Sequence, residues 1–173
     1  PDFLRIVDDA MGIDKEWVRR WRDAVLTKDA VLPYECLSRV DLMDEEIARW
    51  LKDTGCRRIS FGAESGSQKV LDAMTKGTTV EQIRETAEIC REVGIESYFY
   101  MMVGYPGETW EDLKRSVALL RETHPDQFST TIAYPLPGTT FYEQVKDRLP
   151  ERDHSTPDAD FDWNYTAENR LLF

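Results

Sequence analysis

The stretch Arg58-Ile-Ser-Phe-Gly-Ala-Glu-Ser-Gly-Ser67 decides the fold. Its first half has the apolar character of a β-strand, and the strand ends in a polar turn with two glycines that leads into a helix. Residues 4–9, 32–39, 97–106 and 128–137 repeat this arrangement, with an apolar run followed by polar, Gly or Pro residues. Strands that alternate with helices predict a parallel sheet, and ligands bind at the carboxyl ends of such strands.

The spacing of apolar residues alternates between the period of a strand and the period of a helix. It predicts strands at 4–7, 31–37, 57–61, 96–103 and 127–133, and helices at 15–26, 45–53, 68–74, 80–93, 110–122 and 140–148. Asp14, Asp44, Thr79 and Thr109 are the predicted N-caps, and Thr140 with Glu143 opens the last helix. A closed eight-stranded barrel needs about 250 residues. We therefore expect an α/β fold, a partial TIM-like barrel of about five parallel strands over residues 1–150, with a tail at 151–173.

The net charge of −11 and the sequence pI of about 4.7 oppose binding to phosphate backbones or anionic lipid. No run approaches the roughly 20 apolar residues of a membrane-spanning helix, and no signal segment opens the chain. These features predict a cytoplasmic protein for which nucleic acid is a disfavoured partner. The chain begins Pro1-Asp2-Phe3 without an initiator Met, which indicates a fragment of a longer protein.

The three cysteines, Cys36, Cys56 and Cys90, are an odd number at wide spacing, which gives no disulfide framework and fits a reducing compartment. Cys36 lies on a predicted strand, Cys56 at the start of another and Cys90 in a helix. Thiolates placed in this way could not share a cluster. We expect buried structural residues and no metal site within the chain.

Charged side chains follow the predicted strand ends. Glu35 and Arg39 flank the exit of the second strand, Glu64 lies at the exit of the third, and Lys76 ends the short helix behind it. Carboxylates accept hydrogen bonds from hydroxyl or ammonium groups, and a lysine pairs with a carboxylate. A charged small molecule would suit these groups. Structural ion pairs, Glu35 with Arg39 or Glu64 with Lys76, explain the same residue types equally well.

Six motifs in this order resemble the radical SAM superfamily over residues 3–150. They are Asp8-Asp9, Glu35-Cys-Leu-Ser-Arg39-Val-Asp41, Gly55-Cys-Arg-Arg-Ile-Ser-Phe-Gly-Ala-Glu-Ser-Gly-Ser67, Lys76-Gly77, Gly104-Tyr-Pro-Gly-Glu-Thr109 and Pro135-Leu-Pro-Gly-Thr139. The order is similar to the branch with a cobalamin-binding domain, which includes anaerobic magnesium-protoporphyrin monomethyl ester cyclase-like proteins.

The resemblance implies a (β/α)₆ barrel with a [4Fe–4S] cluster that cleaves S-adenosylmethionine into a 5′-deoxyadenosyl radical. It implies cofactor-binding roles for Glu64 at the ribose hydroxyls and Lys76 at the methionine carboxylate, with Glu35 and Arg39 in the same pocket. Tyr100 stands where some relatives have a ribose-binding carboxylate, and Gly104 opens the turn beside it. The resemblance assigns no catalytic residue. The implied partners are a small or lipid-like substrate and an electron donor such as flavodoxin or ferredoxin, under anaerobic conditions, with cobalamin as an optional further cofactor.

The family's Cys-x₃-Cys-x₂-Cys loop is absent from this sequence. A cluster needs those thiolates, so we expect its ligands to lie upstream of Pro1 and the fragment alone to be inactive. Two alternatives remain open: a non-catalytic barrel that serves as a binding scaffold, and a radical SAM methylthiotransferase or other RNA-modifying enzyme. The acidic charge disfavours the RNA-modifying enzyme.

Overall fold

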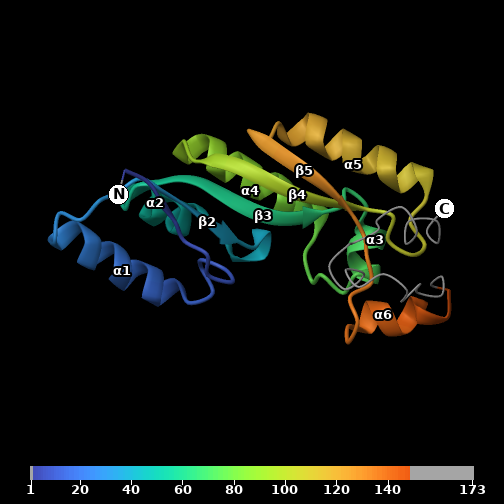
Figure 1. Ribbon diagram of the computed structural model, residues 1–173. Helices are drawn as coiled ribbons and strands as arrows, with labels where there is room; N and C mark the ends of the chain where they lie inside the picture. The colour runs from blue at the N-terminus through green and yellow to red at the C-terminus, as the bar shows by residue number, and fades with distance from the viewer. Residues whose placement is uncertain (1, 149–173) are drawn as a thin grey trace.

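The computed structural model describes residues 2–148, which form one parallel sheet with helices packed along it (Figure 1). The strands are β1 Leu4–Arg5, β2 Tyr34–Ser38, β3 Cys56–Glu64, β4 Glu96–Val103 and β5 Gln127–Ile132. They pair in chain order, and every pairing is parallel. The curled five-stranded sheet confirms the predicted partial TIM-like barrel. The predicted tail at 151–173 lies outside the described residues.

The helices are α1 Lys15–Thr27, α2 Glu45–Asp53, α3 Gln68–Ala73, α4 Val80–Val93, α5 Trp110–Thr123 and α6 Thr140–Val145. Four of them, α1, α2, α4 and α5, contact one another in that order and cover one face of the sheet. The short helices α3 and α6 lie beyond the carboxyl ends of the strands, at the end to which β3 points (Figure 1). Within the described residues, no helix is both long enough and apolar enough to cross a membrane.

The core lies between the sheet and these four helices, as strand alternation requires. Phe61 of β3 and Phe99 of β4 are fully buried on this face, and their rings meet edge to face with centroids 6.2 Å apart. The residues on either side of Phe99 in β4, Tyr98 and Tyr100, are half-buried and point to the opposite face of the sheet. Within residues 2–148, no helix layer packs on that opposite face (Figure 1), which leaves it available for polar residues and for a ligand.

The start of β2 and the end of β3 differ most from the prediction, and the other strand boundaries differ by at most two residues. β2 begins at Tyr34 instead of residue 31, because Pro33 before it lacks the amide hydrogen that a ladder needs. β3 continues to Glu64 instead of ending at Phe61, since it is a central strand with partners on both sides. In addition, Thr139 caps α6 where Thr140 was expected. As a result, Glu35 lies near the start of β2, and Glu64 is the last residue of β3.

Candidate functional site

The carboxyl end of β3 carries a charged pair. Glu64 is the last residue of the strand, and its carboxylate Oε1 lies 2.8 Å from the Lys76 ammonium. Both side chains are mostly buried, with 16% of Glu64 and 26% of Lys76 exposed. The sequence-based alternative of a Glu64–Lys76 ion pair is therefore present in the structure. A carboxylate acceptor and a cation are held together at the edge where ligands bind in parallel sheets.

Gly62 provides the space for this pair. A Cβ atom at position 62 would lie 2.7 Å from Glu64 Oε1 and 2.8 Å from Lys76 Nζ. Any side chain there would displace both charged groups. The pair therefore lies directly over the β3 backbone, on the face opposite the helix layer.

The backbone at Glu64 is unusual. Its φ of 61° lies in the left-handed region, which a residue with a side chain seldom adopts, and the pairing of β3 with β4 shifts register between Gly62 and Glu64. Strained backbone of this kind persists where the surroundings impose it and is concentrated at functional sites. The bulge and the left-handed turn together aim the Glu64 carboxylate back over Gly62.

Arg39 lies beside the pair. It follows the end of β2, and its guanidinium forms a two-pronged contact with Asp41, with distances of 2.9 Å, while reaching the Lys76 carbonyl oxygen at 3.4 Å. The Asp41 hydrogen bonds raise the pKa of Arg39, and Arg39 lowers the pKa of Asp41. The structure thus brings Arg39, Glu64 and Lys76 together.

Tyr100 and Gly104 form the β4 side of the same region. Tyr100 pairs in register with Gly62, and its ring meets that of Tyr98 at 4.9 Å between centroids. Gly104, at a φ of 80°, begins the turn after β4, where its amide donates to the Glu108 carboxylate at 2.5 Å. The second Glu108 oxygen is buried with no partner among the described residues, and burial raises the pKa of this carboxyl.

Glu35 does not belong to this group, and the expectation that it shares a pocket with Glu64 is wrong. Because β2 starts at Tyr34, Glu35 lies near the amino end of the strand, in register with Arg58. Arg58 precedes Gly62 by four residues, roughly 13 Å at the rise of a strand. Glu35 instead pairs with Arg5 at 2.9 Å and with Arg58 at 3.5 Å.

These contacts belong to a row of alternating charges across four strands. Arg5, Glu35, Arg58 and Glu96 stand in register on β1, β2, β3 and β4, and Arg58 reaches Glu96 at 2.7 Å. We call these four residues the ionic row. Each charge has a partner of opposite sign next to it, so the row neutralises itself near the amino ends of the strands.

The turn after β3 is fastened to α5, a feature that the sequence analysis did not identify. The Gly66 amide donates to Ser116 Oγ at 2.8 Å, and Ser67 Oγ donates to Asp112 Oδ1 at 2.7 Å. A Cβ at Gly66 would lie 2.4 Å from the Arg115 carbonyl oxygen. The Ser-Gly-Ser sequence after Glu64 is thus explained by close backbone packing. The sequence signal was Gly66 itself, flanked by two hydroxyl residues.

Asp112 is the buried centre of this attachment, with 1% of its side chain exposed. Lys69, together with Thr109 and Ser67, holds the pKa of the Asp112 carboxyl well below its ordinary range. The carboxylate therefore remains charged at neutral pH and keeps its donors in place.

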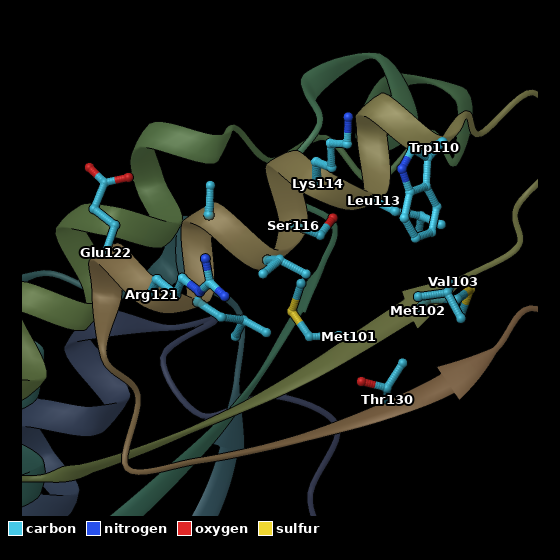
Figure 2. A pocket seen from close by; sticks show the side chains of 13 residues that line it. Met101, Met102, Val103, Trp110, Leu113, Lys114, Ser116, Arg121, Glu122 and Thr130 are labelled. Carbon is cyan, nitrogen blue, oxygen red and sulfur yellow. The ribbon is translucent and has the colours of Figure 1, made fainter.

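A separate hollow lies on the helix side of the sheet, between α5 and the strands β4 and β5 (Figure 2). It has a volume of about 750 Å³, and its walls are mostly apolar, with Met101, Val103, Trp110 and Thr130 among the lining residues. Trp110 of α5 points toward Val103 of β4 (Figure 2). None of the six predicted cofactor-binding residues lines it.

The cysteines do not fit as cluster ligands. Cys36, Cys56 and Cys90 are buried in the core, and the described residues contain no group of three or more His, Cys, Asp or Glu side chains that could hold a metal. The neighbouring Cys56 thiol and burial raise the pKa of Cys36, and burial raises that of Cys90 to about 12. A cluster requires thiolates, which these two residues do not supply at neutral pH.

A half-barrel of parallel strands with a polar site at their carboxyl ends defines the class of partial β/α barrels. Within that class, the model of the radical SAM superfamily matches residues 3–120, and the chain belongs to this family. Members of the family use S-adenosylmethionine and a [4Fe–4S] cluster.

The chain is 26% identical over 140 residues to an uncharacterized methyltransferase of Pyrococcus horikoshii, covering 81% of this chain and 30% of that protein. It is 24% identical over 149 residues to the anaerobic magnesium-protoporphyrin IX monomethyl ester cyclase of Rubrivivax gelatinosus, covering 85% and 27%. The cobalamin- and cluster-bound radical S-adenosylmethionine methyltransferase TsrM from Kitasatospora setae has the same fold, with a TM-score of 0.76 and 20% identity over 86% of this chain and 29% of TsrM. The chain thus spans less than a third of the length of these proteins.

Proposed function

We propose that this chain supplies the S-adenosylmethionine-binding wall of a radical SAM enzyme. The observation that carries the proposal is the Glu64–Lys76 pair over Gly62, with Arg39 beside it. Ribose hydroxyls need acceptors and the methionine carboxylate needs a cation, so the cofactor matches this pair chemically. Glu64 would receive the ribose hydroxyls, and Lys76 would bind the carboxylate.

The remaining predicted residues complete this wall. Tyr100 borders Gly62 in the sheet and would limit the space beneath the sugar. Gly104, held by Glu108, would present backbone without a side chain to the cofactor. Arg39 would keep Lys76 in position through its carbonyl contact. When bound, the cofactor and the reduced cluster supply hydrogen abstraction by a 5′-deoxyadenosyl radical.

The cluster ligands have to come from outside the described residues, since Cys36, Cys56 and Cys90 do not fit that role. We further propose a small or lipid-like metabolite as the substrate, a flavodoxin or ferredoxin as the electron donor and a cytoplasmic, anaerobic setting. Relatives called cyclase and methyltransferase, together with cobalamin-bound structures of the same fold, support a cobalamin-associated enzyme. The whole protein's reaction rests on these relatives.

The test is calorimetric titration of S-adenosylmethionine into the cluster-reconstituted holoprotein. Glu64→Gln and Lys76→Met should each weaken binding about tenfold or more, the effect of losing a charge-assisted hydrogen bond. The exposed Glu111–Lys114 pair on α5 provides matched controls, Glu111→Gln and Lys114→Met, because it has the same charges at 3.4 Å and lies away from the site.

Wild-type binding by the Glu64 and Lys76 variants would contradict the proposed site. Absence of binding by a correctly loaded wild-type protein would instead favour the non-catalytic scaffold. Formation of 5′-deoxyadenosine and methionine by the reduced holoprotein would complete the evidence for the reaction.

A further inference from the structure

Asp112 is a carboxylate in the first turn of α5, and it has far more partners than a surface acid has. Its Oδ1 accepts from Ser67 Oγ at 2.7 Å and from the Arg115 guanidinium at 3.0 Å. Its Oδ2 accepts from the Thr109 amide at 2.9 Å and from the Lys69 ammonium. Both oxygens are therefore fully engaged, and the carboxylate is almost completely buried.

Two of these partners, Ser67 and Thr109, come from turns that border the proposed cofactor site. Ser67 ends the turn after β3, which begins at Glu64, and Thr109 ends the turn after β4, which begins at Gly104. Lys69 joins the two turns a second time, since its ammonium also donates to the Gly107 carbonyl at 3.0 Å. The Asp112 carboxylate is thus the point at which the two turns are connected.

Helix capping explains only part of this arrangement. A capping box requires a side chain at the third helical position that accepts from the cap amide, and the Thr109 contact satisfies that requirement. It requires neither burial nor donors from other segments. The Ser67 and Lys69 bonds reach 45 and 43 residues along the chain, and capping leaves both unexplained.

We propose that Asp112 is a positioning residue for S-adenosylmethionine binding, because it fixes the turn that holds Glu64 over Gly62. This inference rests on the proposed function. Glu64 adopts a left-handed backbone conformation with a φ of 61°, which an L-residue keeps only when its surroundings impose it. Each of the next three residues forms a hydrogen bond to α5. Ser65 and Gly66 bond to Ser116, and Ser67 bonds to Asp112.

Without the hydrogen bonds to Asp112, the turn after β3 would sample more conformations, and the Glu64 carboxylate would no longer be held over Gly62. Ligand affinity depends on such preorganisation, because a binding group that has to be ordered by the ligand contributes less to binding. Asp112 itself does not contact the cofactor in this scheme. A substitution of Asp112 should therefore affect binding only by changing the position of Glu64.

The experiment compares Asp112→Asn with Glu111→Gln in the cluster-reconstituted holoprotein. Both variants remove one negative charge from the first turn of α5, but Glu111 is exposed and pairs only with Lys114 in the described structure. Titration of S-adenosylmethionine should show about a tenfold higher Kd for Asp112→Asn and a change below about twofold for Glu111→Gln. Circular dichroism and iron content establish that each variant is folded and loaded.

A double-mutant cycle with Glu64→Gln separates positioning from general destabilisation. In the Glu64→Gln background, Asp112→Asn should add less than about twofold, because the group that it positions is already impaired. Ser67→Ala, which removes a single hydrogen bond to Asp112, serves as the milder variant if Asp112→Asn does not fold, and it should raise Kd in the same direction.

Wild-type affinity in a folded Asp112→Asn or Ser67→Ala protein would overturn the inference, and so would fully additive effects in the cycle. In either case the proposed function would stand as long as Glu64→Gln alone weakens binding. Wild-type affinity of Glu64→Gln, in contrast, would refute the proposed site, and the role of Asp112 with it.

Discussion

Glu64 Oε1 and Lys76 Nζ meet 2.8 Å apart in the space that a side chain at Gly62 would occupy. The carboxylate comes from a strained strand end and the ammonium from the segment after α3, so two separate elements deliver opposite charges to one point. The pair is mostly buried and lies over backbone without a side chain, and the proposed ligand carries both hydroxyls and a carboxylate. The first prediction follows from the space at Gly62.

Gly62→Ala should weaken S-adenosylmethionine binding about tenfold and leave the fold intact. The new methyl group would contact the ends of two flexible side chains, Glu64 and Lys76, so the charged pair moves while the backbone stays in place. Displacing a charged ligand contact costs about 1.4 kcal/mol or more. Titration calorimetry measures the affinity, and a thermal midpoint close to that of the wild type is the control. Unchanged affinity would contradict the placement of the pair.

Gly66→Ala, in contrast to Gly62→Ala, should lower the stability of the fold. Its methyl group would lie 2.4 Å from the Arg115 carbonyl oxygen and 2.6 Å from Ser116 Cα, and helix backbone cannot move aside as a side chain can. Overpacking of this kind costs about 1–3 kcal/mol. Urea unfolding should show a lower midpoint than for Gly62→Ala. Equal midpoints for the two variants would show that β3 and α5 are not in close backbone contact.

Glu35→Gln should leave cofactor affinity within about twofold of the wild type, because the ionic row lies roughly 13 Å from Gly62. It should lower stability by about 1 kcal/mol or less, since the pairs with Arg5 and Arg58 are partly exposed. Calorimetry and urea unfolding of the same preparation measure the two effects. A large rise in Kd would restore Glu35 to the site and contradict the register of β2.

Glu108 gives a prediction about pH. Burial raises the pKa of its carboxyl above the ordinary value of 4.5, so the folded protein holds this proton at a pH where the unfolded chain has released it. Stability from this group is therefore present at low pH and declines as pH rises from about 4.5 through the raised pKa. Glu108→Gln has no such titration. Its stability relative to the wild type should increase with pH.

Denaturant unfolding of the wild type and of Glu108→Gln between about pH 4 and pH 8 measures this difference. Parallel stability curves for the two proteins would mean that the buried oxygen carries no penalty.

Periodicity and capping residues predicted most of the fold. The bounds of α4 and β4 agree with the pattern residue for residue, since a capping box at Thr79, Gly94 at the helix end and an alternating strand leave little ambiguity. The pattern failed at β2, where apolar residues before Pro33 extended the predicted strand and so moved Glu35 toward the wrong end. Strand register depends on pairing partners, and apolar spacing does not contain that information.

Two residues of the candidate site could be predicted from the sequence, but the contacts that hold them in place could not. A carboxylate after a strand and a lysine after a short helix indicated Glu64 and Lys76, and the structure brings them together. The attachment through Asp112 could not be predicted, because its carboxylate looks like an ordinary helix-capping acid in the sequence. Its burial arises only when α3 and α5 pack on the same turn.

The close approach at Gly66 has a consequence for which positions of α5 tolerate substitution. The separation between the β3 exit and α5 is set by main-chain atoms, so substitutions of exposed side chains along the helix should not alter it. Exposed positions of α5 that line neither the hollow nor the attachment at Asp112, such as Glu111, are free to change. Substitutions at such positions should therefore leave the dimensions of the proposed cofactor wall unchanged.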